Sequence, residues 1–320
     1  MNLFYNRGVP LLSANSIEQG RAANSAGTSG RRFDVPAPLR LWHLTSLDAP
    51  TVAVVWALAF AWVAGVALPM WVPLFLALVV WVVYIGDRLL DVGAALHTPQ
   101  IPPLRERHYF HYRHRRVLVP LAVAAACAAA VIVFSLMPAA AREWNSVLAV
   151  AAGAYFSGVH SRRKLQKLLP PKLASLDSKE LLVGLLFAVG CALPALSRPA
   201  SGPLSPLWPL WSVTLFFAAL AWLNCYAIER WEAASQATRN SRVLPAASLL
   251  GIAGLLLMAA VLYSNQPRAA ALIGAGAGSA LLLAQLDRSQ RCMTSLALRT
   301  CADLVLLSPV LLIPFAFLTR

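Results

Sequence analysis

The chain has 320 residues, of which 59% are hydrophobic and only 12% are charged. Soluble domains carry roughly 45–50% apolar and about 25% charged residues, so the composition excludes an ordinary soluble protein, a disordered chain and a disulfide-rich scaffold. It indicates an integral membrane protein. The net charge of +14 would suggest nucleic acid in a soluble protein, but basic loops on the cytoplasmic side explain it here, and we expect no nucleic-acid partner.

The N-terminal segment, residues 1–46, is predicted to be a basic cytoplasmic tail. Residues 15–32 are rich in Ser, Asn, Ala and Gly and have no apolar periodicity, so we expect the tail to be largely disordered. It lacks the apolar stretch of a signal peptide. Residues 47–320 are then predicted to form one polytopic membrane domain.

Nine apolar segments follow the tail, each bounded by charges, Pro or Gly. A hydrocarbon core about 30 Å thick needs roughly 20 residues of helix, and backbone polar groups in lipid must be satisfied within the segment. The expected fold is therefore an all-α integral membrane bundle of about nine transmembrane helices. The segments are residues 51–68, 70–86, 117–141, 144–159, 181–197, 207–228, 243–263, 269–286 and 304–318.

The basic residues alternate between the loops of this nine-span arrangement. The tail and the loops on its side hold 23 of the 27 Lys and Arg residues, and the other side holds four. This bias predicts a cytoplasmic N-terminus and an external C-terminus, in what we expect to be a bacterial inner membrane. Twelve of the thirteen acidic residues also lie on the cytoplasmic side. The rule for basic residues does not explain these carboxylates.

Two aspartates, Asp87 and Asp91, directly follow the second segment and are spaced i and i+4 on one helical face. Like charges at this spacing repel each other, and a divalent cation between them would remove the repulsion. Mg²⁺ prefers one or two carboxylates together with phosphate oxygens. The alternative interpretation is that Arg88 and nearby arginines neutralise both aspartates at the level of the lipid headgroups.

A second polar group lies at the end of the sixth segment: Asn224 within it, and Glu229 and Glu232 just beyond it. The two glutamates are spaced i and i+3, again on one face, at the same predicted depth and on the same side as the first pair. A simpler interpretation is an interfacial anchor made by Arg230 and Trp231. Because two such pairs occur at equivalent helix ends, we expect all four carboxylates to face one cytoplasmic cavity.

Basic residues complete the candidate site. Arg162, Arg163 and Lys164 follow the fourth segment, and Arg binds phosphate as a fork while Lys binds it as a point charge. Attraction to anionic lipid headgroups is an equally good explanation for any one of them. Residues 105–116 contain three histidines among several arginines, and we favour a basic amphipathic interfacial helix over a metal site there.

This arrangement resembles the UbiA superfamily of intramembrane prenyltransferases. That family has nine transmembrane helices, a cytoplasmic N-terminus and two Asp-rich motifs after helices two and six. The end of its first motif, DxxxD, is matched by Asp87 and Asp91, its basic pair by Arg162 and Arg163 or by Arg163 and Lys164, and the following helix start by residues 182–184. The second motif differs from the family's, since Asn224 is followed by two glutamates.

The resemblance implies transfer of an isoprenyl group from an isoprenyl diphosphate to a lipophilic acceptor, with Mg²⁺ assisting departure of the diphosphate. It implies metal binding and catalytic roles for Asp87, Asp91, Glu229 and Glu232, with Asn224 assisting, and phosphate contacts from Arg88, Arg163 and Lys164, with Arg162 as a further candidate. Two alternatives remain: a transporter, which usually buries ionisable groups near the midplane, and a non-catalytic membrane scaffold that retains the fold.

Overall fold

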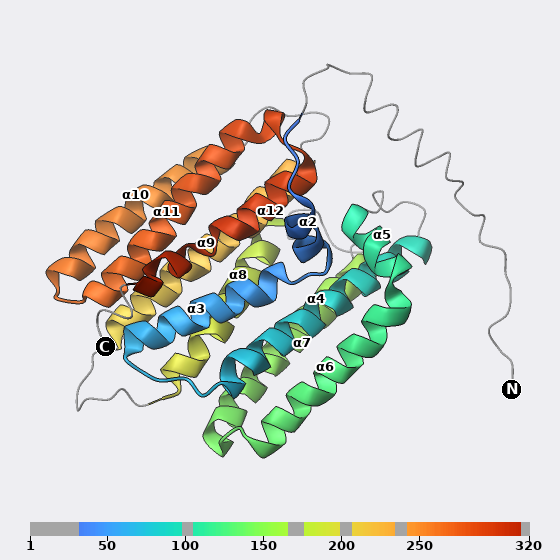
Figure 1. The fold of residues 1–320 in the computed structure, drawn as a ribbon, viewed down its shortest axis with the longest axis horizontal. Helices are drawn as coiled ribbons and strands as arrows, with labels where there is room; N and C mark the ends of the chain where they lie inside the picture. Colours follow the sequence, from blue (N-terminus) through green and yellow to red (C-terminus); the bar gives the residue numbers. More distant parts are fainter. Residues whose placement is uncertain (1–31, 98–104, 166–175, 199–206, 234–241, 315–320) are drawn as a thin grey trace, which may run out of the picture.

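The computed structural model describes residues 32–97, 105–165, 176–198, 207–233 and 242–314. Within these ranges the fold is helical, with one isolated β-bridge and two short 3-10 turns, Gln290–Cys292 and Ser308–Leu312. The long helices run side by side (Figure 1). They are α2 (Ala37–Leu44), α3 (Asp48–Ala64), α4 (Trp71–His97), α5 (Glu106–Arg113), α6 (Arg115–Ser135), α7 (Ala139–Leu165), α8 (Leu176–Leu196), α9 (Trp208–Ala233), α10 (Val243–Tyr263), α11 (Pro267–Ser289) and α12 (Ser295–Val305).

Six helices within the described ranges are long and apolar enough to cross a membrane: α4, α6, α9, α10, α11, and α12 with the turn that follows it. A seventh is added if α2 and α3, which meet at 86°, are counted as one bent span. This confirms the prediction of an all-α, multi-pass membrane fold. Each of the nine predicted segments coincides at least in part with a helix, but the number of spans is established only as six or seven, by length and composition.

The predicted start of the ninth segment, residue 304, is wrong. Helix α12 begins at Ser295, and the Thr294 side chain caps it by accepting a hydrogen bond from the Ala297 amide at 3.1 Å. Arg299 and Asp303 therefore lie on the helix rather than in a preceding loop. Because they are four residues apart, they share one helical face.

The described part of the predicted tail is also more ordered than expected. Phe33 pairs with the segment before α12: its amide donates to the Cys292 carbonyl at 2.7 Å, and its carbonyl accepts from the Thr294 amide at 3.0 Å. Helix α2 then buries His43 and Leu44. Residues 32–46 thus belong to the folded domain, while residues 1–31 of the predicted tail lie outside the described residues.

An aromatic cluster joins the first long helix to the middle and the end of the chain. The Trp56 ring of α3 stacks on Phe217 of α9 with centroids 3.8 Å apart, and Phe60 packs beside both. The buried Trp56 indole donates a hydrogen bond to the Leu306 carbonyl at 2.8 Å. These contacts fix α3 between α9 and α12, and so position the residues at the beginning of α3.

Helices α8 and α9 pack with their backbones almost in contact at Gly184. A Cβ atom at this position would lie 2.6 Å from the Trp222 backbone nitrogen and 3.0 Å from the Ala218 carbonyl oxygen. Only glycine fits here without displacing a helix backbone. This close approach places the cavity-facing side chains of α8 and α9 on one continuous wall.

Candidate functional site

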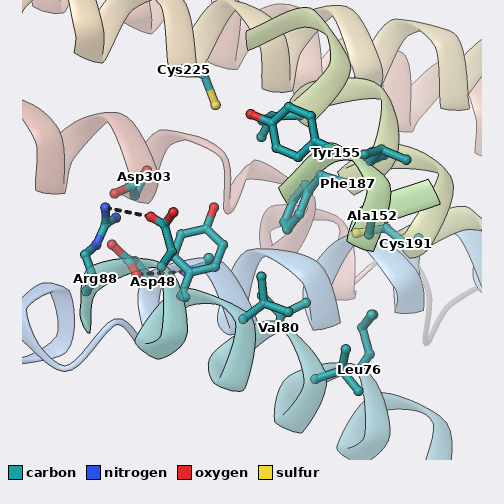
Figure 2. A pocket seen from close by; sticks show the side chains of 18 of the residues that line it. Asp48, Leu76, Val80, Arg88, Ala152, Tyr155, Phe187, Cys191, Cys225 and Asp303 are labelled. Carbon is teal, nitrogen blue, oxygen red and sulfur yellow. Dashed lines mark hydrogen bonds and ion pairs between the residues drawn. The ribbon is translucent and has the colours of Figure 1, made fainter. Parts of the chain in front are cut away.

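A cavity of about 890 Å³ lies among the helices and is the candidate functional site. Helices α3, α4, α6, α7, α8, α9 and α12 contribute to its walls, and residues of α5 reach one end of it. Figure 2 shows the two ends of this space: Asp48, Arg88 and Asp303 gather at one end, and Leu76, Val80 and Phe187 line the other.

The face of helix α4 that lines the cavity is apolar along its first part and polar along its last part. Phe75, Leu76, Val79, Val80 and Val83 line the cavity first, and Tyr84, Asp87, Arg88 and Asp91 continue the same lining. At 1.5 Å rise per residue, the distance from Phe75 to Asp91 is about 24 Å. The cavity thus has a long apolar body and a charged end, which suits a molecule with a charged head and a hydrocarbon tail.

The structure brings most of the sequence-predicted site residues together. The four predicted carboxylates all line this one cavity, which confirms that they share a common space, and Asn224 and Arg88 line it with them. The predicted basic residues Arg162, Arg163 and Lys164 lie in the last turn of α7, but their side chains fall outside the described residues.

Asp87 and Asp91 are one turn apart and partly accessible, with side chains 35% and 26% exposed. The Asp87 carboxylate has a long contact of 3.4 Å with its neighbour Arg88, and Asp91 lies 3.7 Å from His108 Nε2. Neither distance is that of a strong charge-assisted hydrogen bond. Both carboxylates line the cavity, and Glu229 on α9 is a third carboxylate on the same lining.

Glu232 differs from its expected role. Its carboxylate accepts hydrogen bonds from Arg107 at 2.9 Å and Arg299 at 3.1 Å, and from Arg105 as well. These arginines come from the α5 region and from α12, so Glu232 joins three distant parts of the chain. With three guanidinium groups on its two oxygens, this carboxylate is a poor candidate for a metal ligand, and we do not retain it as one.

The sequence analysis missed a second group of charged residues on the cavity wall: His43, Asp48 and Asp303. His43 Nδ1 lies 2.7 Å from Asp48 Oδ2 and 3.5 Å from Asp303 Oδ2. Asp48 and Asp303 line the cavity, whereas His43 lies behind them and is only 3% exposed. The available signal was that both aspartates stand directly at the edge of an apolar run.

Helix α5 is packed more deeply than an interfacial helix would be. Arg107, His108 and His111 are buried. His111 Nδ1 donates to the Arg107 carbonyl at 2.7 Å, and His111 Nε2 lies 3.3 Å from the Ser46 hydroxyl. Burial lowers the pKa of His111 below its ordinary value of 6.5. His111 therefore acts as a neutral structural group that ties α5 to the α2–α3 corner.

The charges along the cavity do not cancel. Its described lining includes seven carboxylates, counting Glu180 of α8, and four guanidinium groups. If all these groups are ionised, the described lining carries three more negative than positive charges, which favours a cation over a bare anion in this space.

Comparison of the chain with family models, with curated proteins and with solved structures gives no match.

Proposed function

We propose that the protein transfers an isoprenyl group from an isoprenyl diphosphate to a lipophilic acceptor within the membrane. The observation that carries this proposal is the single cavity with carboxylates and guanidinium groups at one end and an apolar body along α4. The charged end suits a diphosphate and the apolar body suits an isoprenoid chain. The acceptor, being soluble in lipid, would enter the same space from the bilayer.

Mg²⁺ is the proposed cofactor, because the excess of carboxylates calls for a divalent cation before a diphosphate can bind. Asp87 and Asp91, with Glu229 opposite, would hold it through carboxylate oxygens, the ligands that Mg²⁺ prefers. When bound, the ion supplies neutralisation of the charge that develops on the departing diphosphate.

The remaining steps rest on the chain's own residues. Arg88, buried at the charged end, would donate to phosphate oxygens. Val80 and Phe187 would keep water away from the allylic carbon while its bond to the diphosphate oxygen breaks. A bond to the acceptor then forms and the acceptor loses a proton, so the reaction is a substitution at the allylic carbon.

The proposal includes nine transmembrane helices in a bacterial inner membrane, with the N-terminus and the charged end of the cavity in the cytoplasm and the C-terminus outside. A reporter active only in the periplasm, fused after Arg320, is expected to be active. The same reporter inserted at Lys172, between the fourth and fifth predicted spans, is expected to be inactive. The reverse pattern would refute this orientation.

The decisive test uses purified full-length protein and a labelled isoprenyl diphosphate, with and without Mg²⁺. Asp91→Asn is expected to weaken Mg²⁺-dependent binding by about tenfold or more, because it removes one of two adjacent anionic ligands. Thermal stability should hold, or rise by a few tenths of a kcal/mol, because repulsion with Asp87 is relieved.

Glu143→Gln is the matched control, because Glu143 is an exposed carboxylate outside the cavity lining, and binding should not change. If the wild-type protein binds no isoprenyl diphosphate in the presence of Mg²⁺, the proposal fails and the non-catalytic scaffold is favoured. If Asp91→Asn binds as well as the wild type, Asp91 has no metal role.

A further inference from the structure

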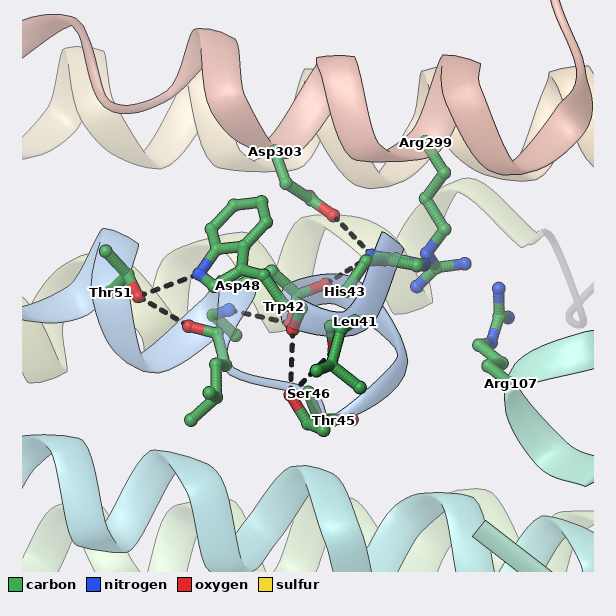
Figure 3. Close-up of polar contacts among 12 residues, drawn as sticks. Leu41, Trp42, His43, Thr45, Ser46, Asp48, Thr51, Arg107, Arg299 and Asp303 are labelled. Atoms are coloured by element: carbon green, nitrogen blue, oxygen red, sulfur yellow. Dashed lines mark hydrogen bonds and ion pairs between the residues drawn. The ribbon is translucent and has the colours of Figure 1, made fainter. Parts of the chain in front are cut away.

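A second polar cluster stands on the cavity wall, apart from Asp87 and Asp91. His43 of α2, Asp48 of α3 and Asp303 of α12 converge so that one ligand atom of each lies within 4.8 Å of the others (Figure 3). We propose that these three side chains form a binding site for a divalent transition-metal ion such as Zn²⁺. The proposal concerns a site separate from the Mg²⁺ site above and does not depend on prenyl transfer.

The spacing of the ligand atoms is close to what such an ion needs. With bonds of about 2.1 Å, two ligand atoms of a tetrahedral zinc site lie roughly 3.4 Å apart. His43 Nδ1 is 3.5 Å from the Asp303 oxygen and 2.7 Å from the Asp48 oxygen. The His43–Asp48 pair has to open by about 0.7 Å to reach this separation. The third pair, Asp48 and Asp303, lies within 4.8 Å, so carboxylate rotations rather than backbone movements would bring the three ligand atoms to one ion.

Burial distinguishes this cluster from an accidental surface group. The His43 and Asp48 side chains are 2% and 7% exposed, and that of Asp303 is 15% exposed. Two carboxylates buried side by side are costly unless a positive charge lies between them. The Arg299 guanidinium, one turn from Asp303 on α12, donates to Glu232 at 3.1 Å. A cation bound directly to Asp48 and Asp303 would neutralise the two buried carboxylates more completely.

Asn224 gives a second, independent indication of a ligand. Its amide nitrogen donates to Asp303 Oδ1 at 3.1 Å, which orients the carboxylate so that Oδ2 is directed to His43. Its amide oxygen is buried, and among the described residues it has no hydrogen-bond partner. Such buried polar atoms are nearly always satisfied. An ion beside Asp303, or water bound to that ion, would satisfy this oxygen, and the Asn224–Asp303 contact is the outer support usual at metal sites.

The donor set favours a transition metal over Mg²⁺. One imidazole nitrogen with two carboxylate oxygens is a set that suits Zn²⁺ and its neighbours, whereas Mg²⁺ takes oxygen ligands. His43 lies behind the wall while Asp48 and Asp303 line the cavity. The remaining coordination positions of the ion would therefore face the cavity, where a ligand oxygen could bind.

The test measures metal binding by the full-length protein in detergent after treatment with a chelator. Zn²⁺ is titrated, and Co²⁺ is used as a spectroscopic probe, because an imidazole ligand changes its visible absorption. The double variant Asp87→Asn/Asp91→Asn removes the proposed Mg²⁺ site. It is expected to retain one equivalent of Zn²⁺ and the same Co²⁺ spectrum.

In that background His43→Gln is expected to lose the Co²⁺ spectrum and weaken Zn²⁺ binding by about tenfold or more. Asp303→Asn preserves the side-chain shape and can still accept from Asn224, so it provides a second variant should His43→Gln fail to fold. It is expected to weaken Zn²⁺ binding similarly. Binding of no ion by the double variant, or equal binding by all of these variants, would overturn the proposal and leave a protonated His43 bridging two carboxylates.

Discussion

Glu232 holds together the α5 region, α9 and α12, and its replacement by Gln should therefore destabilise the protein. The variant keeps the side-chain shape and one acceptor oxygen but leaves three guanidinium groups without their counter-charge. The Arg107 and Arg299 side chains are only 10% and 14% exposed, whereas Arg105 is 43% exposed. Solvent therefore screens mainly one of the three contacts.

Breaking a buried ion pair by removing one partner costs about 3–5 kcal/mol. Because glutamine retains one acceptor and one arginine is half exposed, we expect the lower end, about 3 kcal/mol. A chain of this size loses about 2 °C of melting temperature per kcal/mol, so the expected fall is about 6 °C. Thermal unfolding in detergent, followed by fluorescence of the ten tryptophans, measures it directly.

Glu229→Gln is the matched control for this experiment. Glu229 lies on the same helix and lines the same cavity, but within the described residues it has no ion pair. Its replacement should change stability by about 0.5 kcal/mol or less. If Glu232→Gln melts within about 1 °C of Glu229→Gln, the three-arginine contact contributes no stability and the reasoning fails.

Two further variants test the packing and the burial of charge. Gly184→Ala should destabilise the protein by about 1–3 kcal/mol, because the new methyl group meets the Trp222 backbone. Gly153→Ala, whose methyl group meets nothing within 4 Å, should be neutral or slightly stabilising. Equal melting temperatures of the two variants would contradict this reasoning. Burial lowers the pKa of His111 in the folded state, so its contribution to stability is complete above its ordinary pKa of 6.5 and falls as the pH drops below that value. His111→Gln should therefore reduce the fall in melting temperature between about pH 7.5 and about pH 5.5. An unchanged fall would show that His111 does not contribute.

The helical membrane fold was predictable because it depends on long apolar runs, which hydropathy detects directly. The start of α12 was not, because Arg299 and Asp303 interrupt the apolar run at a helical spacing of four. Their polar face is directed into a cavity inside the bundle. An average over all faces of a helix cannot distinguish such a face from a loop.

The candidate site was predictable only in part. Asp87 and Asp91 could be found because both lie on one turn of one helix, so that spacing alone places them together. The His43, Asp48 and Asp303 cluster requires three helices to meet, and no local spacing encodes that. The pairing of Glu232 with arginines from two other segments is likewise a property of the folded bundle, which is why its carboxylate looked available in the sequence.

The hydrogen bond from Trp56 to Leu306 joins residues 250 positions apart and bears on how the protein is made. While the ribosome is still synthesising α4 to α11, helices α2 and α3 are already present, but the partners supplied by α12 are not. His43 cannot contact Asp303 until α12 has been synthesised. The charged end of the cavity is therefore completed late in synthesis, and a nascent chain arrested before α12 would lack the wall that carries Arg299 and Asp303.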